Sequence, residues 1–251
     1  MVTCEKTMVT SDYHGIYLDK RAYAVMLAFA TLYKPNNFVI NGDLLDFYSI
    51  SKFDKNSDRL GDMQDEIDQT NYILKHLRDR LGSDVNMYFL EGNHDNRMQK
   101  YLWVHPELKS LKALKLENIL DLEKNDIKQI SVDADYWKKD AGHLKIGDVI
   151  ITHGDSRLNG AKGGKFAGYN TALNFMENTI IGHVHRLSMK EHTAPTKNVI
   201  GVECGCLCQI VPGADWQQGF VTFETINNKL HNLELHPIHD YKVNYQGQII
   251  G

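Results

Sequence analysis

Short apolar runs that end in clusters of Asp, His and Asn constrain the fold of this chain more than any other feature. Each run is short and apolar enough to predict a β-strand, and each cluster follows its run directly. The clusters occupy residues 12–15, 41–46, 91–95, 152–155 and 182–185. Helical patterns separate the first three runs, and this alternation predicts a layered α/β sheet with sites at the carboxyl ends of its strands. We therefore expect the five clusters to lie close together.

The first half of the chain predicts three strands, at residues 6–11, 37–40 and 85–90, which are joined by two helices. Asp19 is the expected N-cap of the first helix, and Gly82 is the expected stop of the second. The apolar residues at helical spacing are Ala22, Val25, Phe29 and Leu32 in the first helix and Ile67, Leu74, Leu77 and Leu81 in the second. Each helix is therefore predicted to pack one apolar stripe against the sheet.

Residues 97–141 interrupt this alternation with a Lys- and Leu-rich segment, for which we predict a helical insert of two or three short helices. Its aromatic residues include Tyr101, Trp103, Tyr136 and Trp137. These side chains either pack the insert onto the core or form a lid over the site that stacks on a substrate ring. Packing is the more common role for such side chains.

The second half predicts mostly strands. Residues 144–151 have strand character with a hairpin turn at Gly147. Residues 198–210 and 220–235 are expected to form antiparallel strands, with a hairpin turn at residues 227–228. No internal repeat, low-complexity tract or linker divides the chain, so the pattern favours a single domain.

Length and composition fit one α/β domain spanning residues 1–251. Charged residues make up 24% of the chain and the formal net charge is −4, so no overall basic field indicates nucleic-acid binding. No apolar run approaches the roughly 18–20 residues needed to cross a bilayer, and no signal-peptide pattern opens the chain. We expect a cytoplasmic protein without a membrane partner.

Three cysteines alternate along one segment, Cys204, Cys206 and Cys208, while Cys4 stands alone. On a strand, this spacing would place all three on one face. That face either binds a soft metal or packs like small apolar residues. Packing is favoured, because zinc sites usually draw their ligands from two separate segments. Disulfides are not expected in a cytosolic chain.

The side chains in the five clusters are those that divalent metals prefer. Carboxylate, imidazole and amide oxygen ligands bind hard and borderline cations. Seven such residues follow the predicted strands: Asp12, His14, Asp43, Asn93, His153, His183 and His185. Seven ligands suit two metals about 3.5–4 Å apart if one carboxylate bridges them, and such a pair would lower the pKa of a water from about 15.7 towards 7 for attack on a phosphate ester. Each residue alone is more commonly structural, so the ordered set carries the hypothesis.

The five motifs resemble those of the calcineurin-like metallophosphoesterases. They are Asp12-x-His14, Gly42-Asp43-x-x-Asp46, Gly92-Asn93-His94-Asp95, His153-Gly154 and Gly182-His183-x-His185. One such motif is weak evidence, whereas all five in order are very specific. The middle segment and residues 216–220 are also similar to small metallophosphoesterases of bacteria and phages. The resemblance implies a four-layer α/β/β/α sandwich in the cytoplasm of a bacterium or phage-infected cell.

The resemblance also implies a role for each residue in the motifs. One metal would be bound by Asp12, His14 and His185, the second by Asn93, His153 and His183, and Asp43 would bridge the two. His94 matches the general acid of the family, and Asp46 matches the carboxylate that orients it. Asp95 has no implied ligand role. The expected cofactor is a pair of Mn²⁺ ions, with Fe, Zn, Ni or Mg as alternatives.

The motifs indicate a phosphate ester but not which one. Lys162 and Lys165 lie in a Gly-rich loop near Arg157 and could hold a second phosphate or a nucleic-acid backbone; a solvated loop is the alternative. Arg97 is another candidate substrate contact, because a guanidinium matches phosphate geometry. We expect hydrolysis of phosphate mono- or diesters, with a nucleotide, DNA or RNA as substrate. The alternatives are a protein phosphatase and a non-catalytic scaffold with the same fold.

Overall fold

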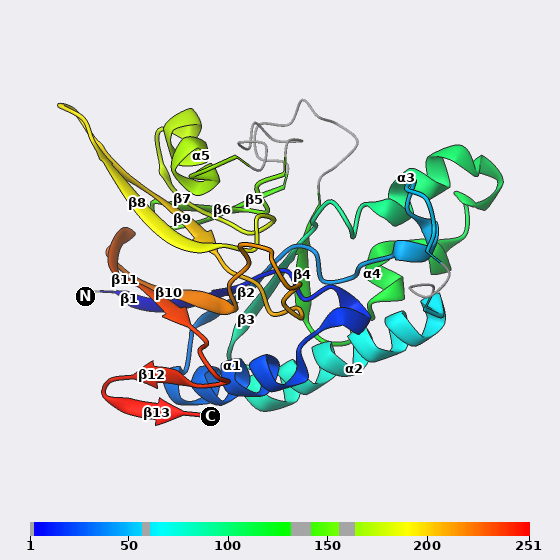
Figure 1. Cartoon of the computed structure of the whole chain (residues 1–251), viewed down its shortest axis with the longest axis horizontal. Coiled ribbons are helices and arrows are strands. Elements are labelled where there is room, and N and C mark those ends of the chain that lie inside the picture. The colour runs from blue at the N-terminus through cyan, green and yellow to red at the C-terminus, as the bar shows by residue number, and fades with distance from the viewer. Residues whose placement is uncertain (1–2, 57–60, 132–141, 156–163) are drawn as a thin grey trace.

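Two β-sheets packed face to face form the centre of the computed structural model, which describes residues 3–56, 61–131, 142–155 and 164–251 (Figure 1). Over these residues one sheet has the strand order β11-β10-β1-β2-β3-β4 and the other has the order β5-β6-β7-β9-β8. The first sheet contains β1 (Cys4–Thr10), β2 (Asn37–Asn41), β3 (Asn86–Leu90), β4 (Ile127–Ile130), β10 (Gly219–Ile226) and β11 (Lys229–Pro237). The second contains β5 (His143–Ile146), β6 (Val149–Thr152), β7 (Asn178–Ile181), β8 (Leu187–Thr193) and β9 (Asn198–Cys204).

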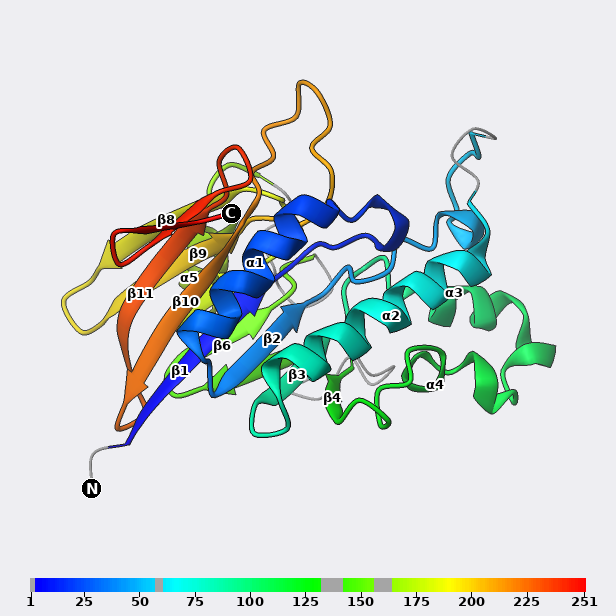
Figure 2. The same cartoon turned by 90° about the horizontal axis from the view of Figure 1, so that it is seen from below.

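Helices cover the outer face of each sheet. α1 (Lys20–Tyr33) and α2 (Met63–Leu81) lie on the first sheet and α5 (Ala167–Phe175) on the second, which confirms the expected sandwich (Figures 1 and 2). The smaller elements are α3 (Arg97–Val104), α4 (Leu116–Ile119), the hairpin β12 (Val243–Tyr245) and β13 (Gln248–Ile250), and 3-10 turns at Gly15–Tyr17, Tyr48–Ile50, Pro106–Leu108 and Lys112–Leu114. In the described ranges no helix has both the length and the apolar character to span a bilayer.

Alternation of side chains along the first sheet fills two separate cores. Met8 and Phe38 pack towards α1 and α2, whereas their neighbours Val9 and Val39 pack against the second sheet. Residues of the second sheet complete the layer between the sheets, among them Ile151, Ile180 and Val202. Because both faces of the first sheet are buried, a slip in register would expose apolar side chains. The packing therefore fixes where each strand ends.

Helix ends follow the local signals in the sequence. Oδ1 of Asp19 accepts hydrogen bonds from the backbone N–H groups of Arg21 (3.0 Å) and Ala22 (3.2 Å), which confirms the predicted N-cap of α1. Gly82 ends α2 with a φ of +84°. Leu32 was assigned wrongly to the apolar stripe: it is 53% exposed, because Tyr33, four residues after Phe29, continues the buried face in the last turn of α1 instead.

The predicted helical insert at residues 97–141 is only partly correct. α3, α4 and two 3-10 turns occupy its first part, but Ile127–Ile130 form β4, which pairs in parallel with β3. In the sequence Ile-Lys-Gln-Ile the two isoleucines flank two polar residues, and they pack into the two different cores on either side of the sheet, so no period of two is visible. Of the four aromatic residues, Tyr136 and Trp137 lie outside the described residues. Trp103 is 46% exposed, so it is not a core residue.

The predicted hairpins are correct, but β8 and the two strands of the hairpin β12–β13 were missed. β5 and β6 form the pair predicted around Gly147, and β10 and β11 turn at residues 227–228. β8 was not predicted. It is the edge strand of the second sheet and is mostly exposed, so its polar side chains, such as those of Lys190 and Glu191, mask its period-two pattern.

The three alternating cysteines do not share one strand. β9 ends at Cys204, and Gly205 turns the chain with a φ of +79°. Cys206 and Cys208 follow outside the strand, and all three side chains are buried as free thiols. Burial is therefore confirmed, whereas the single strand at residues 198–210 is wrong, because the glycine interrupts the period of two.

Burial of His236 predicts a pH-dependent loss of stability. Its ring stacks on Phe220 (centroids 5.1 Å apart), its Nε2 lies 2.7 Å from Oγ1 of Thr222, and burial lowers its pKa from 6.5 to about 4. The folded state holds the ring neutral, whereas the unfolded chain takes up a proton below its pKa of 6.5. The contribution of the neutral ring to the free energy of unfolding is therefore complete above pH 6.5 and falls as the pH falls towards 4, by about 2 kcal/mol at pH 5.

We expect the free energy of unfolding in urea to fall less between pH 7 and pH 5 in His236→Gln than in the unsubstituted protein. Glutamine does not titrate, so the difference between the two pH-dependent losses isolates this ring. Equal losses in the two proteins would show that His236 is not the titrating group.

Candidate metal centre

The five clusters converge where strands of both sheets end. The backbone N–H of Asp12 donates to the carbonyl of Gly42 (3.1 Å), which joins the loops after β1 and β2. The N–H of Gly182 donates to the carbonyl of His153 (3.0 Å), which joins the loops after β7 and β6. Gly92, after β3, approaches so closely that an added Cβ would lie 2.1 Å from Oδ1 of Asp43. The predicted meeting of these loops is thus observed.

Asp43 lies at the centre of the converging side chains. Its Oδ2 is 3.2 Å from Nε2 of His153 and 3.9 Å from Nε2 of His14, two rings that come from different sheets. Asn93 Oδ1 lies 3.3 Å from Nε2 of His153, and the ligand atoms of Asp43, His153 and His183 lie within 4.8 Å of one another. A carboxylate in this position has oxygen lone pairs available on two sides.

Asp12 and His185 form the opposite side of the cluster. Nε2 of His185 lies 3.1 Å from Oδ1 of Asp12 and 3.1 Å from Nε2 of His14. Oδ1 of Asp12 is buried and has no hydrogen-bond partner among the described residues. Two imidazole nitrogens facing each other beside an unsatisfied carboxylate oxygen suit a cation, since each atom offers a lone pair. The donor set therefore fits a divalent metal.

Opposite charges hold the cluster together in the protein alone. Burial acts to raise the pKa of Asp43, but nearby imidazoles, first His153 and then His94, lower it well below its usual value. Burial likewise acts to lower the pKa of His153, and the charge of Asp43 outweighs it and raises that pKa to about 10. Asp12 acts in the same way on His185, whose pKa also rises to about 10. Protons on these rings supply the positive charge that buried carboxylates require.

Asp46 joins two histidines through one oxygen. Its Oδ1 accepts hydrogen bonds from Nδ1 of His94 (2.8 Å) and from Nδ1 of His14 (3.1 Å). Burial acts to raise the pKa of Asp46, but these two hydrogen bonds lower it far below its usual value. Arg97 donates to the backbone carbonyl of Asp46 (2.6 Å), and its Nη2 lies 3.3 Å from Nε2 of His94. The Arg97 guanidinium therefore lies beside the outward nitrogen of the His94 ring.

Two buried acids support the site without facing its centre. Asp95, which had no assigned role, accepts hydrogen bonds from the backbone N–H groups of Leu45 (2.9 Å) and Gly92 (2.8 Å) and so joins the two central loops. Burial, aided by the charge of Asp43, raises the pKa of Asp95 to about 7. Glu66 was missed. It accepts from the N–H groups of Asp46 and Phe47, and a carboxylate in line with the apolar face of α2 was its only signal in the sequence.

Five of the seven candidate ligands have left-handed backbone conformations. The φ angles are 55° at Asp12, 54° at His14, 49° at Asp43, 66° at His183 and 57° at His185. Such angles are uncommon in residues other than glycine and often accompany functional sites, where the surrounding contacts hold them in place. The loops therefore adopt unfavourable backbone conformations that direct these side chains towards the centre of the site.

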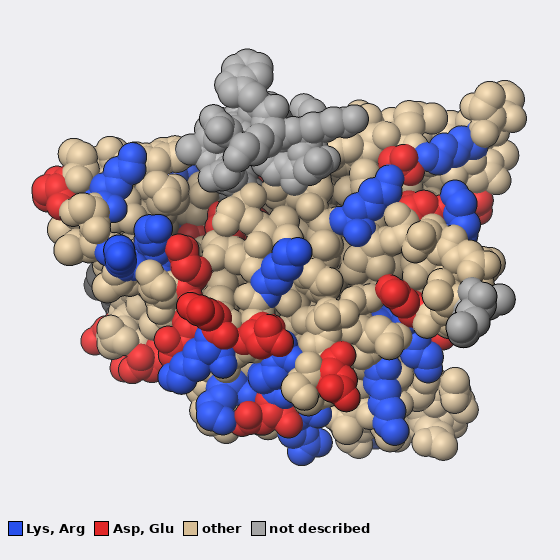
Figure 3. Space-filling model, turned by 180° about the vertical axis from the view of Figure 1, so that it is seen from behind, with Lys and Arg blue, Asp and Glu red and all other residues tan. Residues whose placement is uncertain are grey.

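The candidate phosphate contacts are not all brought to the centre. Lys165 is exposed and lies just before α5, while Lys162 and Arg157 lie outside the described residues. On the face shown in Figure 3, Lys and Arg side chains intermingle with Asp and Glu side chains. That face therefore has no extended region of one charge sign.

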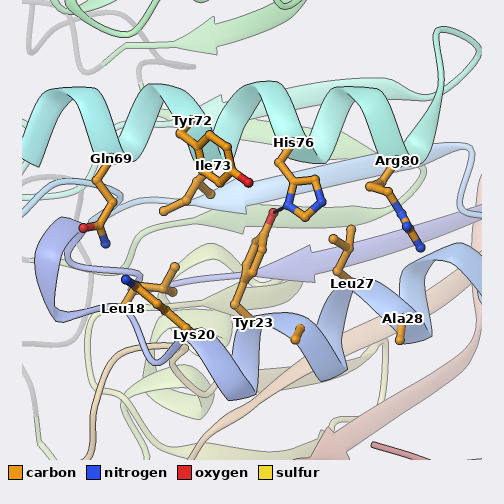
Figure 4. Close-up of a pocket in the computed structure, with 11 residues that line it drawn as sticks. Leu18, Lys20, Tyr23, Leu27, Ala28, Gln69, Tyr72, Ile73, His76 and Arg80 are labelled. Carbon is orange, nitrogen blue, oxygen red and sulfur yellow. Dashed lines mark hydrogen bonds between the residues drawn. The ribbon is translucent and has the colours of Figure 1, made fainter.

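A separate groove of about 490 Å³ opens between α1 and α2, on the outer side of the first sheet (Figure 4). Its wall includes Leu27, Ile73 and Tyr72, and the hydroxyl of Tyr23 lies 3.3 Å from Nδ1 of His76. The lining contains no carboxylate, and none of its residues belongs to the five clusters. The groove is therefore distinct from the candidate metal centre.

Residues 5–196, which include all five clusters, match the family model of the calcineurin-like phosphoesterases. The chain belongs to that family. It is 25% identical to the Gene 54 protein of Mycobacterium phage L5 and 26% identical to that of Mycobacterium phage D29, with 98% of each chain covered in both cases.

Among solved structures, the chain is similar to a single mutant of Vps29 from Entamoeba histolytica, with a TM-score of 0.46 and 13% identity over 97% of this chain and 95% of that one. A predicted phosphoesterase from Streptococcus pneumoniae has a TM-score of 0.39 and 14% identity over 98% and 96% of the two chains. Membership of the phosphoesterase family and the His/Asp groups together support a metal-dependent phosphoesterase in general terms.

Replacing Gly92 by Ala is expected to remove stabilisation by metal. In the unsubstituted protein, Mn²⁺ at 100 times its Kd should add about 2.7 kcal/mol to the free energy of unfolding. For a chain of this size, that corresponds to a rise in Tm of roughly 5–10 °C. In Gly92→Ala the new Cβ would lie 2.1 Å from Oδ1 and 2.3 Å from the backbone N of Asp43, so Asp43 must move.

Differential scanning calorimetry with and without Mn²⁺ measures this rise. Gly213→Ala is the control: its φ of +86° strains the substitution and lowers the Tm without metal, but a Cβ there meets no atom within 4 Å, so the rise with Mn²⁺ should be kept in full. An undiminished rise in Gly92→Ala would show that the position of Asp43 does not matter for binding.

Proposed function

We propose that this chain is a binuclear metal-dependent phosphoesterase that hydrolyses phosphate mono- or diesters, with a nucleotide or a nucleic-acid end as the favoured substrate. The observation that carries the proposal is the position of Asp43, whose carboxylate lies within 4 Å of His14, His94 and His153 at the junction of the two sheets. A carboxylate so placed can bridge two cations. When bound, a metal pair supplies Lewis acidity to the phosphate and lowers the pKa of a water.

Two groups of side chains would hold the pair. Asp12, His14 and His185 would bind one ion, and Asn93, His153 and His183 would bind the other. In the first group Nε2 of His185 lies 3.1 Å from both Oδ1 of Asp12 and Nε2 of His14. In the second group Oδ1 of Asn93 lies 3.3 Å from Nε2 of His153, and these distances support the division. Mn²⁺ is the proposed metal, since the donors are oxygen and imidazole nitrogen, and Fe, Zn, Ni and Mg are the alternatives.

His94 is proposed to protonate the leaving group. Its Nδ1 is held by Asp46, so its Nε2 is the nitrogen that would deliver a proton; that atom lies 3.8 Å from Oδ2 of Asp43 and 3.3 Å from Nη2 of Arg97. The proton would pass from Nε2 to the leaving alkoxide oxygen and be restored from solvent, which reaches the side chain because it is 20% exposed.

Arg97 and the Lys162–Lys165 loop are the proposed substrate contacts. Arg97 has an Nη2 atom 3.3 Å from the reactive nitrogen of His94, so it can also reach an oxygen near the leaving group. Lys165 is exposed and free to meet a second phosphate. These contacts favour a substrate with more than one phosphate, such as a nucleotide or an oligonucleotide end. A cytoplasmic location is part of the same proposal.

His94→Ala is expected to lower the kcat for a dinucleotide, whose leaving group is an alkoxide, in the presence of Mn²⁺ by about 10²–10⁴, the usual contribution of a general acid. His231→Ala, at an exposed position on β11, is the control and should keep the full rate. The two variants should bind Mn²⁺ equally, since neither side chain is a proposed ligand. Turnover in the unsubstituted protein that survives His94→Ala would remove His94 from the mechanism, and no turnover with any of the five metals would overturn the proposal.

For a nucleic-acid substrate, Lys162→Ala combined with Lys165→Ala should weaken binding of a single-stranded oligonucleotide. Losing two phosphate contacts is expected to reduce the slope of log K against log salt by about 1.4. Fluorescence anisotropy at several salt concentrations measures both effects, with Lys229→Ala combined with Lys242→Ala, two exposed positions outside the five clusters, as the charge-matched control. An unchanged slope would exclude the loop as a nucleic-acid contact.

A further inference from the structure

Three of the four candidate-ligand histidines share one arrangement of their ring nitrogens. Nε2 points to the centre, and Nδ1 meets a second group behind the ring. The partner of Nδ1 is the Asp46 carboxylate for His14 (3.1 Å) and the backbone carbonyl of Asn41 for His153 (2.8 Å). For His185 it is Sγ of Cys208, at 3.9 Å. Histidines that bind metals usually have such a partner, but a thiol is an unusual one.

Cys208 belongs to a loop that encloses the Asp12–His185 side of the centre. Its backbone N–H donates to the carbonyl of Asp12 (3.1 Å), so the residue contacts both members of that pair. In the same loop, the ring of Trp216 packs across His185 (centroids 4.2 Å apart), and the N–H of Gln217 donates to the carbonyl of His185 (2.7 Å). The loop between β9 and β10 thus holds this histidine by its backbone, its ring face and its outer nitrogen.

We propose that Cys208 is a positioning residue for the metal centre, whose sulfur accepts the Nδ1–H of His185. A neutral imidazole carries one proton, and a partner at Nδ1 keeps that proton there, which leaves the Nε2 lone pair for a cation. This inference rests on the proposed function, because it assigns His185 to a metal. It also explains why Cys208 is only 2% exposed although it lies outside any strand.

The neighbouring cysteines differ in their contacts. Sγ of Cys204 lies 3.2 Å from the carbonyl of Val9, between the sheets, and Sγ of Cys206 lies 3.6 Å from the carbonyl of Gln217. Neither sulfur has a contact to a candidate ligand among the hydrogen bonds of the described residues. Cys204 therefore provides a buried cysteine for comparison, since replacing it also removes a buried sulfur but no contact to His185.

The test is the affinity for Mn²⁺ measured by isothermal titration calorimetry on the metal-free full chain. Loss of a residue behind a metal ligand typically weakens binding 10–100-fold. Sulfur is a weak acceptor, so we expect a loss of about 10-fold in Cys208→Ala. Cys208→Ser should remain within a few-fold of the unsubstituted protein, because its hydroxyl can also accept the Nδ1–H. Cys204→Ala should bind as the unsubstituted protein does.

Three results would overturn the inference. Equal affinity in Cys208→Ala and the unsubstituted protein would show that the sulfur does not position His185. A thiolate-to-cobalt charge-transfer band in the Co²⁺-loaded protein, lost in Cys208→Ser, would make Cys208 a direct ligand instead. Absence of Mn²⁺ binding by the unsubstituted protein would overturn the metal centre itself, so failure of the proposed function is distinguished from failure of this inference.

Discussion

Two buried carboxylates, Asp12 and Asp43, need positive charge close by, and this need is the constraint on which the rest of the site depends. Each is at most 1% exposed, and an unpaired buried charge costs several kcal/mol. The surrounding imidazoles share that charge, which is why the pKa values of His153 and His185 rise while those of the carboxylates fall. A divalent cation would replace the protons on these rings. The metal centre and the folded junction of the sheets therefore stabilise each other.

The backbone of the site is costly in its own right. Five left-handed residues at about 1–3 kcal/mol each amount to roughly 5–15 kcal/mol, as much as the whole net stability of a typical domain. Contacts from outside the loops must offset this cost. Asp95 and Glu66 do so by accepting backbone N–H groups of residues 44–47 and 92, which ties the loop of Asp43 to α2 and to the loop after β3.

The convergence of the candidate ligands could be predicted because each of them follows closely after a strand, and strand ends are visible in a single sequence. The supporting residues could not, since their partners are backbone groups far away in the chain: Glu66 lies 20 residues from Asp46. Cys208 was assigned to a strand for the same reason, because nothing local reveals that Gly205 turns the chain towards His185. The edge strands β4 and β8 were missed or misassigned because exposure weakens their apolar pattern.

Asp46 connects the two activities that the proposed function requires. One of its oxygens accepts hydrogen bonds from His14, a candidate metal ligand, and from His94, the candidate acid. A carboxylate with a strongly lowered pKa is a constant hydrogen-bond acceptor, so it favours a proton on Nδ1 of both rings. In the proposed mechanism the inward nitrogen of His14 would then be available to a cation, while that of His94 would face the leaving group. The same contact thus gives two neighbouring histidines opposite tasks, and the difference between them comes only from what lies in front of each ring.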